Sequence, residues 1–165
     1  MNSPSTVARQ PISGIAQWHT CFRALLHDAC AQSSQRLVLC AQDWRHWPLS
    51  ETDVIQTLEQ WLRPSVSMVI LTHDFEALER LHPRFVAWRQ RWDQYITGRK
   101  TIKPYQSETP CFTLSDQYAI WLTNPALFTG MAGSDRALYK QVAEQADEWL
   151  THRAVNAFAA NTLGL

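Results

Sequence analysis

The chain has 165 residues, 45% of them hydrophobic and 18% charged, and its 15 basic residues balance its 15 acidic residues. This length suits one domain with a full hydrophobic core, and the composition excludes a largely disordered chain. The balanced charge argues against nonspecific nucleic-acid binding by the whole surface.

The first residues contain no apolar signal-peptide core, and no stretch of about 18 apolar residues indicates a membrane span. The four cysteines form no CxxC pair, so we expect reduced thiols and a cytoplasmic protein. Residues 1–13 are rich in Ser, Pro and Gln and are expected to be a mobile N-terminal arm. Residues 14–165 are expected to form a single α/β domain.

The first half of the chain predicts a regular alternation of elements. Apolar residues at helical spacing predict a helix over 15–33. The apolar runs 36–41 and 65–72 predict buried strands, and residues 50–62 between them predict a helix with Ser50 as its N-cap. Strand, helix and strand with tight connections predict a βαβ unit.

The second half predicts two more helices before a set of short strands. Asp74 is expected to cap a short helix, and Pro83 to begin a longer one that reaches about residue 96 and ends before Gly98. Short segments near 100–105, 111–114, 117–123 and 126–130 suggest antiparallel or mixed additions to the sheet. After them, the pair Gly133-Ser134 is expected to open a final helix. The predicted fold class is α/β, with a single mixed β-sheet, a βαβ start and flanking helices.

Residues 80–103 contain seven of the fifteen basic residues and one acidic residue, interleaved with aromatic side chains. Such a concentration of charge favours a surface for an anion. At about 100° per residue, the aromatic side chains of the predicted helix share one face, which we interpret as core. Arg84 and Arg91 lie together on its flank, and Arg80 joins them if Pro83 does not bend the helix axis.

Polar residues follow both predicted strands of the βαβ unit. Because ligands bind beyond the carboxyl ends of parallel strands in open α/β sheets, we expect a site at this edge. Asp74 is interpreted as a helix cap rather than as the orienting partner of a His73 base, and no catalytic residue, metal ligand or cofactor is predicted. The candidate ligand-binding residues are Asp43, Trp44, His73, Asp74, Arg80, Arg84 and Arg91.

The order of elements from about Leu37 to Leu150 resembles one half of the phospholipase D-like fold. The likeness to that family's closing strands, Gly-Ser turn and last helix is carried by SDQYAIWLTNPALFTGMAGSDRALYKQVAEQADEWL, residues 115–150. A second likeness, to a family of proteobacterial proteins of this relationship, is carried by HPRFVAWRQRWDQYI, residues 82–96. The resemblance implies a phospholipase D-like half-domain.

Phospholipase D-like enzymes carry the motif His-x-Lys-x4-Asp, in which the histidine attacks phosphorus and the lysine holds phosphate oxygens. None of the six histidines of this chain has a lysine two positions later. Where the family would place its motif, this chain has Ser115-Asp116-Gln117. The resemblance therefore implies an inactive derivative.

The leading hypothesis is a noncatalytic domain whose positively charged edge binds a phosphate-bearing or other anionic ligand, or a protein partner. An alternative is an enzyme that acts on phosphoesters or nucleic acid through a nonstandard centre around Asp43, His73 and Asp74. A third is a homo-oligomeric scaffold in which Trp44 and Trp47 are exposed anchors. Nucleic acid is the less favoured partner, and the oligomeric state stays open.

Overall fold

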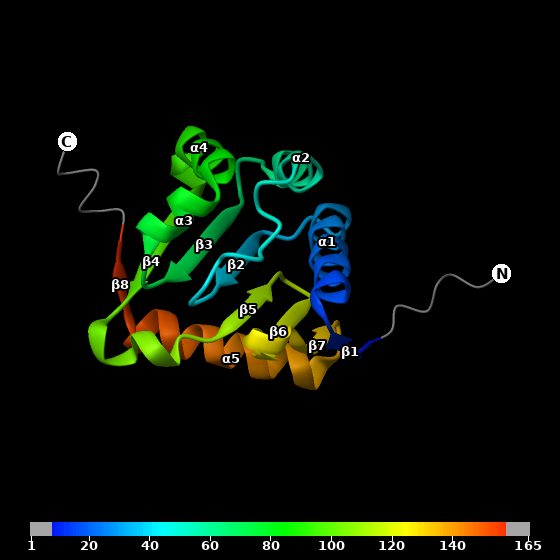
Figure 1. The fold of residues 1–165 in the computed structure, drawn as a ribbon. Coiled ribbons are helices and arrows are strands. Elements are labelled where there is room, and N and C mark those ends of the chain that lie inside the picture. The colour runs from blue at the N-terminus through cyan, green and yellow to red at the C-terminus, as the bar shows by residue number, and fades with distance from the viewer. Residues whose placement is uncertain (1–7, 158–165) are drawn as a thin grey trace.

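One mixed β-sheet runs through the computed structural model, which describes residues 8–157 (Figure 1). Its strands lie in the order β1-β7-β6-β5-β2-β3-β4-β8. The three strands β2, β3 and β4 are parallel, and the remaining neighbours pair antiparallel. The bounds are β1 Gln10–Ser13, β2 Arg36–Cys40, β3 Ser67–Thr72, β4 Ile96–Thr101, β5 Cys111–Leu114, β6 Ala119–Asn124, β7 Thr129–Gly133 and β8 Ala154–Asn156.

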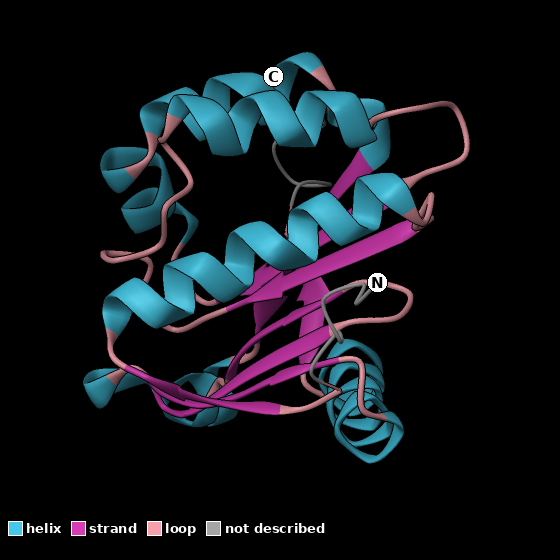
Figure 2. Cartoon of the chain, turned by 90° about the vertical axis from the view of Figure 1, so that its right-hand side faces the viewer, coloured by secondary structure: helices cyan, strands magenta, loops and turns pink. Residues whose placement is uncertain are grey.

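Helices cover both faces of this sheet (Figure 2). Four of them pack with one face of the sheet in a large aromatic core, and α5 packs alone against the other face, beneath the sheet in Figure 1. The bounds are α1 Ile15–Ala31, α2 Thr52–Trp61, α3 Phe75–Leu81, α4 Pro83–Arg91 and α5 Arg136–His152. Short 3-10 turns lie at η1 Asp93–Tyr95, η2 Lys103–Glu108 and η3 Pro125–Leu127.

Strand β2 is buried on both faces, which explains its uninterrupted apolar sequence. Leu37 and Leu39 contact the core under α1–α4, whereas Val38 and Cys40 contact the core under α5. With α2 and the parallel strand β3, it forms the predicted βαβ unit. The α/β class, the single mixed sheet and the flanking helices are therefore confirmed.

The predicted long helix from Pro83 to residue 96 is wrong in its second half. Helix α4 ends at Arg91, and β4 follows after one turn of 3-10 helix, with Gly98 buried inside the strand. From Ile96 to Lys100 this strand pairs in parallel with β3. The pairing satisfies backbone groups that β3 would otherwise leave open at the edge of the sheet, a tertiary effect that helical periodicity does not reveal.

Three smaller expectations also need correction. Residues 10–13, assigned to the mobile arm, form β1, which pairs with β7 and buries Ile12; residues 1–7 lie outside the described residues. Glu51, not Ser50, occupies the N-cap of α2. Strand β7 begins at Thr129, because η3 occupies the start of the segment that was expected to be extended. Among residues 8–157, no helix has both the length and the apolar character that a membrane crossing requires.

Candidate functional site

A pocket of about 500 Å³ opens where β2 ends. Its walls come from the loop 42–47 after β2, the start of β5, the end of β6 and the η3 turn. This position agrees with the expectation that ligands bind beyond the carboxyl ends of parallel strands. The lining residues are Trp18, Gln42, Asp43, Arg45, His46, Trp47, Thr109, Cys111, Leu122, Asn124, Pro125, Ala126 and Phe128.

Two histidines hold the backbone of the loop 42–47 in place. His82, only 5% exposed, contacts the Trp44 carbonyl through Nε2 at 2.7 Å and the Ser50 hydroxyl through Nδ1 at 3.0 Å. Because a carbonyl oxygen only accepts, Nε2 is the donor, and in the neutral ring Nδ1 accepts from the hydroxyl. His19 of α1 donates in the same way to the His46 carbonyl at 2.6 Å.

A third contact fixes the loop from inside the core. Trp44 is 1% exposed, and its indole Nε1 donates to the Thr72 hydroxyl at the end of β3, over 3.0 Å. Its ring packs on that of Trp47, with 4.7 Å between centroids. Both tryptophans are buried, so the expectation of exposed aromatic anchors for a scaffold is wrong.

The floor of the pocket is aromatic. Trp18 and Trp47 meet edge to face at 5.2 Å, and Trp18 stacks on Phe128 at 5.7 Å. His46 lies edge-on against the same phenyl ring at 5.2 Å. The ring of Trp18, on α1, belongs both to the hydrophobic core and to the pocket wall.

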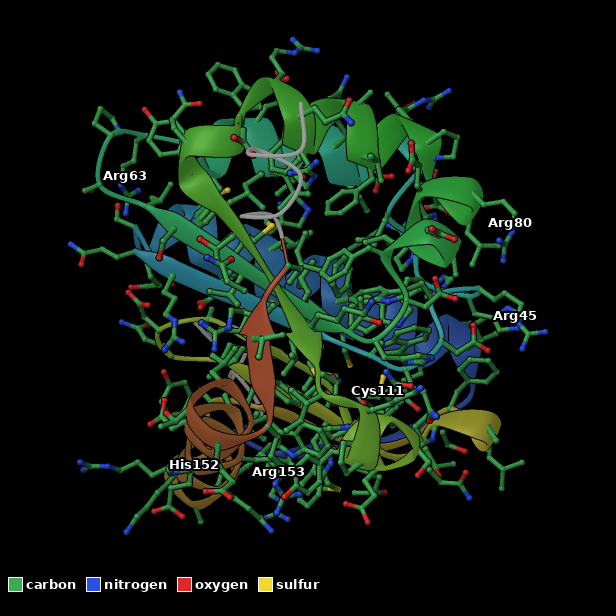
Figure 3. The ribbon with its side chains drawn as sticks, turned by 90° about the vertical axis from the view of Figure 1, so that its left-hand side faces the viewer. Arg45, Arg63, Arg80, Cys111, His152 and Arg153 are labelled. Carbon is green, nitrogen blue, oxygen red and sulfur yellow. The ribbon has the colours of Figure 1, made fainter. Side chains whose placement is uncertain are left out.

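An ion pair lies at the mouth of the pocket. Arg45 Nη2 donates to Asp43 Oδ2 at 2.7 Å, its Nε donates to the same oxygen at 3.1 Å, and its backbone N–H donates to Oδ1 at 2.9 Å. The Arg45 side-chain hydrogen bonds lower the pKa of Asp43, so the carboxyl group is ionised at neutral pH. The two side chains are 50% and 69% exposed. Figure 3 shows Arg45 projecting outward from this edge, with Cys111 farther inside.

Of the residues that the sequence proposed for ligand binding, only Asp43 lines this pocket. His73 is half-buried, and its Nδ1 has no hydrogen-bond partner among the described residues. Asp74 is the N-cap of α3 and accepts from the Ala77 N–H at 2.9 Å, as predicted. The pocket therefore does not bring Asp43, His73 and Asp74 together as one centre.

The predicted row of arginines is divided by contacts with α2. Arg84 donates through Nη1 to the Thr52 hydroxyl of α2 at 3.1 Å and to the Ser50 carbonyl just before that helix at 3.2 Å. Arg91 pairs with Glu59 of α2 at 3.8 Å. Arg80 is exposed on α3 and has no ion-pair partner among the described residues. In Figure 3 it projects from the same edge as Arg45, whereas Arg63 lies at the opposite edge. None of the three predicted arginines lines the pocket.

Sequence reasoning missed most of the polar residues of the site. Arg45 and His46 follow directly on the strand end that was singled out, so the same rule could have included them. Thr109 and Asn124 carried no such signal, because they reach the pocket from the connection before β5 and from the end of β6.

Cys111 lines the pocket but is not a nucleophile at neutral pH. Burial, with a smaller contribution from the negative charge of Asp43, raises the pKa of its thiol to about 12. The thiolate fraction is then more than about a thousandfold below that of an ordinary cysteine. We expect iodoacetamide at pH 8 to leave Cys111 unmodified in the folded protein and to alkylate it after denaturation, as measured by peptide mass spectrometry. Rapid alkylation in the folded protein would contradict this assignment.

Neither the protein-family models nor the curated protein sequences give a match to this chain. The fold is similar to that of solved structures. One of them is TrmBL2, an archaeal chromatin protein whose structure shows a novel mode of DNA binding, with a TM-score of 0.61 and 13% sequence identity. The similarity covers 93% of this chain and 53% of that chain, so this chain spans about half the length of the TrmBL2 chain. At this identity the similarity shows the fold alone.

Proposed function

We propose that this domain is noncatalytic and binds a small organic ligand with an anionic group in the pocket at the end of β2, where Arg45 pairs with that group. The observation that carries the proposal is the combination of an aromatic floor with one arginine at the mouth. The volume of about 500 Å³ lies in the range of small-molecule sites, which are mostly apolar with a few polar groups that orient the ligand.

The roles of the ionisable side chains around this edge support a noncatalytic domain. His19 and His82 are engaged with backbone carbonyls of the loop, and Asp74 is engaged with a helix N-terminus. A general base needs a free nitrogen or oxygen within reach of the substrate, and His73, whose Nδ1 has no hydrogen-bond partner among the described residues, does not line the pocket. The imidazole of His46, which does line the pocket, has no carboxylate among the described residues that orients it by a hydrogen bond.

The phospholipase D-like relationship is part of the same proposal and is supported by the sequence patterns. At the place of the family's motif, Asp116 accepts from the Gln35 and Arg36 N–H groups at 2.8 and 3.2 Å, at the start of β2. Ser115 accepts from the Tyr118 N–H at 3.0 Å. Both side chains stabilise a turn at the edge of the sheet opposite the pocket, which favours a domain that has lost this family's chemistry.

DNA is the alternative ligand. DNA binding is what is said of TrmBL2, and Arg45 and Arg80 project from one edge of this domain (Figure 3). Against this alternative, Arg84 donates to Ser50 and Thr52, and the whole chain is neutral. We therefore treat DNA binding as an outcome to be tested beside the small ligand.

The test is a titration with 3-phenylpropionate and with phenyl phosphate. Tryptophan fluorescence monitors binding, because Trp18 and Trp47 line the pocket. We expect saturable binding that Arg45→Gln weakens by about tenfold or more, since a hydrogen bond to a charged group contributes about 1.5–3 kcal/mol. Arg80→Gln is the matched control, because it removes the same charge from the same edge, and it should leave the affinity unchanged.

Two results would count against the small-ligand proposal. One is the absence of saturable binding for either probe, and the other is an equal affinity in Arg45→Gln. A DNA duplex, titrated in parallel, separates the alternative: binding that falls steeply with salt and is weakened by both arginine variants indicates DNA.

A further inference from the structure

One ion pair neutralises the charged side chains that line the pocket. Asp43 and Arg45 are the charged residues of its lining, and they are paired with each other. Both side chains are at least half exposed, and exposed pairs of this kind are weak because water competes for both partners. A ligand can therefore open the pair if it offers equivalent partners to both side chains.

A ligand with a single charge opens the Asp43–Arg45 ion pair poorly. A simple anion that takes the guanidinium of Arg45 lies beside the Asp43 carboxylate, which loses its partner and repels the incoming charge. A simple cation meets the converse difficulty at Arg45. A ligand with both charges exchanges one protein ion pair for two protein–ligand ion pairs, and no charge is left without a partner.

The geometry also limits how the two ligand charges are spaced. Arg45 Nη2 and Asp43 Oδ2 lie 2.7 Å apart, on side chains two residues apart in the chain. Ligand groups that pair with both must therefore be close together as well, as the ammonium and carboxylate of an α-amino acid are. In a compound whose two charges lie at opposite ends, one of them would fall outside this contact.

The rest of the ligand has an apolar environment. Behind the exposed ion pair lie the buried rings of Trp18 and Trp47, the half-buried ring of Phe128, and Leu122. Large apolar side chains gain most from such a surface, and aromatic ones gain further from ring contacts.

We infer that the pocket binds a free α-amino acid with a large apolar side chain, with its carboxylate on Arg45, its ammonium on Asp43 and its side chain against the aromatic floor. This inference rests on the proposed function and narrows its ligand from an anion to a zwitterion. It adds a role for Asp43 that the proposed function does not require.

The test compares ligands of one shape by isothermal titration calorimetry at pH 7. L-phenylalanine carries both charges, 3-phenylpropionate lacks the ammonium, and 2-phenylethylamine lacks the carboxylate; L-leucine tests an aliphatic side chain. We expect one of the two amino acids to bind at least about tenfold more tightly than 3-phenylpropionate and 2-phenylethylamine, the effect of one lost charged hydrogen bond.

Variants of the carboxylates complete the test. Asp43→Asn should weaken amino-acid binding at least about tenfold while leaving or improving the binding of 3-phenylpropionate. Asp53→Asn is the matched control, because Asp53 is also an exposed carboxylate paired with an arginine, Arg23 at 2.7 Å, and does not line the pocket. It should change neither affinity.

The possible results separate this inference from the proposed function. If neither amino acid binds more tightly than 3-phenylpropionate, or if Asp43→Asn has no effect, the zwitterion is overturned and the anionic ligand stays in place. If 3-phenylpropionate or phenyl phosphate binds and neither amino acid does, the zwitterion is likewise overturned and the anionic ligand stays in place. Failure of all these compounds to bind overturns both.

Discussion

Replacement of Trp44 by alanine is expected to lower the free energy of unfolding by about 3–5 kcal/mol, the range for removing a large buried aromatic side chain. Trp44 is 1% exposed and packs on Trp47, so its removal leaves a cavity under the loop 42–47. Urea denaturation measures the change. Because that loop carries Asp43 and Arg45, the binding of 3-phenylpropionate should weaken as well, even under conditions where the variant is folded.

The hydrogen bond from Trp44 to Thr72 gives this prediction a sharper form. Thr72→Val leaves the buried indole N–H without a partner and should lower stability by about 1–3 kcal/mol. The double variant Trp44→Phe/Thr72→Val removes both partners and should be more stable than the sum of the two single effects predicts. Strict additivity, or a loss below about 1 kcal/mol for Trp44→Ala, would mean that the contact does not hold the loop.

Replacement of Gly130 by alanine should be at least as damaging, at about 3 kcal/mol or more, the upper end for overpacking. An added Cβ would overlap the Trp121 carbonyl oxygen and lie 2.8 Å from the Leu122 Cα. These are backbone atoms, so no side chain can move aside. The register of β6 and β7 shifts between Trp121 and Asn124, which brings the two backbones close together at this point.

Gly14→Ala is the matched control for Gly130→Ala. Gly14 has φ 100°, but an added Cβ there would meet nothing within 4 Å, so its replacement by alanine tests backbone strain alone, about 1–3 kcal/mol. Thermal unfolding followed by circular dichroism compares the two. Gly130→Ala should cost clearly more stability than Gly14→Ala, because it adds the overlap with the β6 backbone. Equal losses of stability in the two variants would contradict the close approach of β6 and β7.

The elements that were predicted well are those with a strong local pattern. Helix α1 spans Ile15–Ala31 as its apolar spacing indicates, and the uninterrupted apolar runs at 36–41 and 65–72 became β2 and β3. Asp74 caps α3 because N-capping depends on a side chain and a backbone N–H three residues apart. In each case the information lies within a few residues of the element that it determines.

Strand β4 shows where local pattern fails. The aromatic periodicity of α4 continues to Trp92 and Tyr95, which pack against the core from half-buried positions outside a regular α-helix. Ile96 and the residues after it are extended because β3 offers a free edge beside them. The local sequence of this segment is compatible with a helix and with a strand. Pairing with the neighbouring β3 makes it a strand.

For the candidate site, too, some features follow from local sequence and others from tertiary packing. The sequence by itself determined that polar groups, Asp43 among them, stand at the carboxyl edge of a parallel βαβ unit. The succession of strand, helix and strand, and the polarity of the residues after each strand, are local properties of the chain. Only the tertiary structure decided that Arg45 lies at the mouth of a pocket and that Arg84 and Arg91 are engaged by α2. Those outcomes depend on which distant backbone and side-chain groups lie within hydrogen-bonding distance, and packing between elements sets those distances.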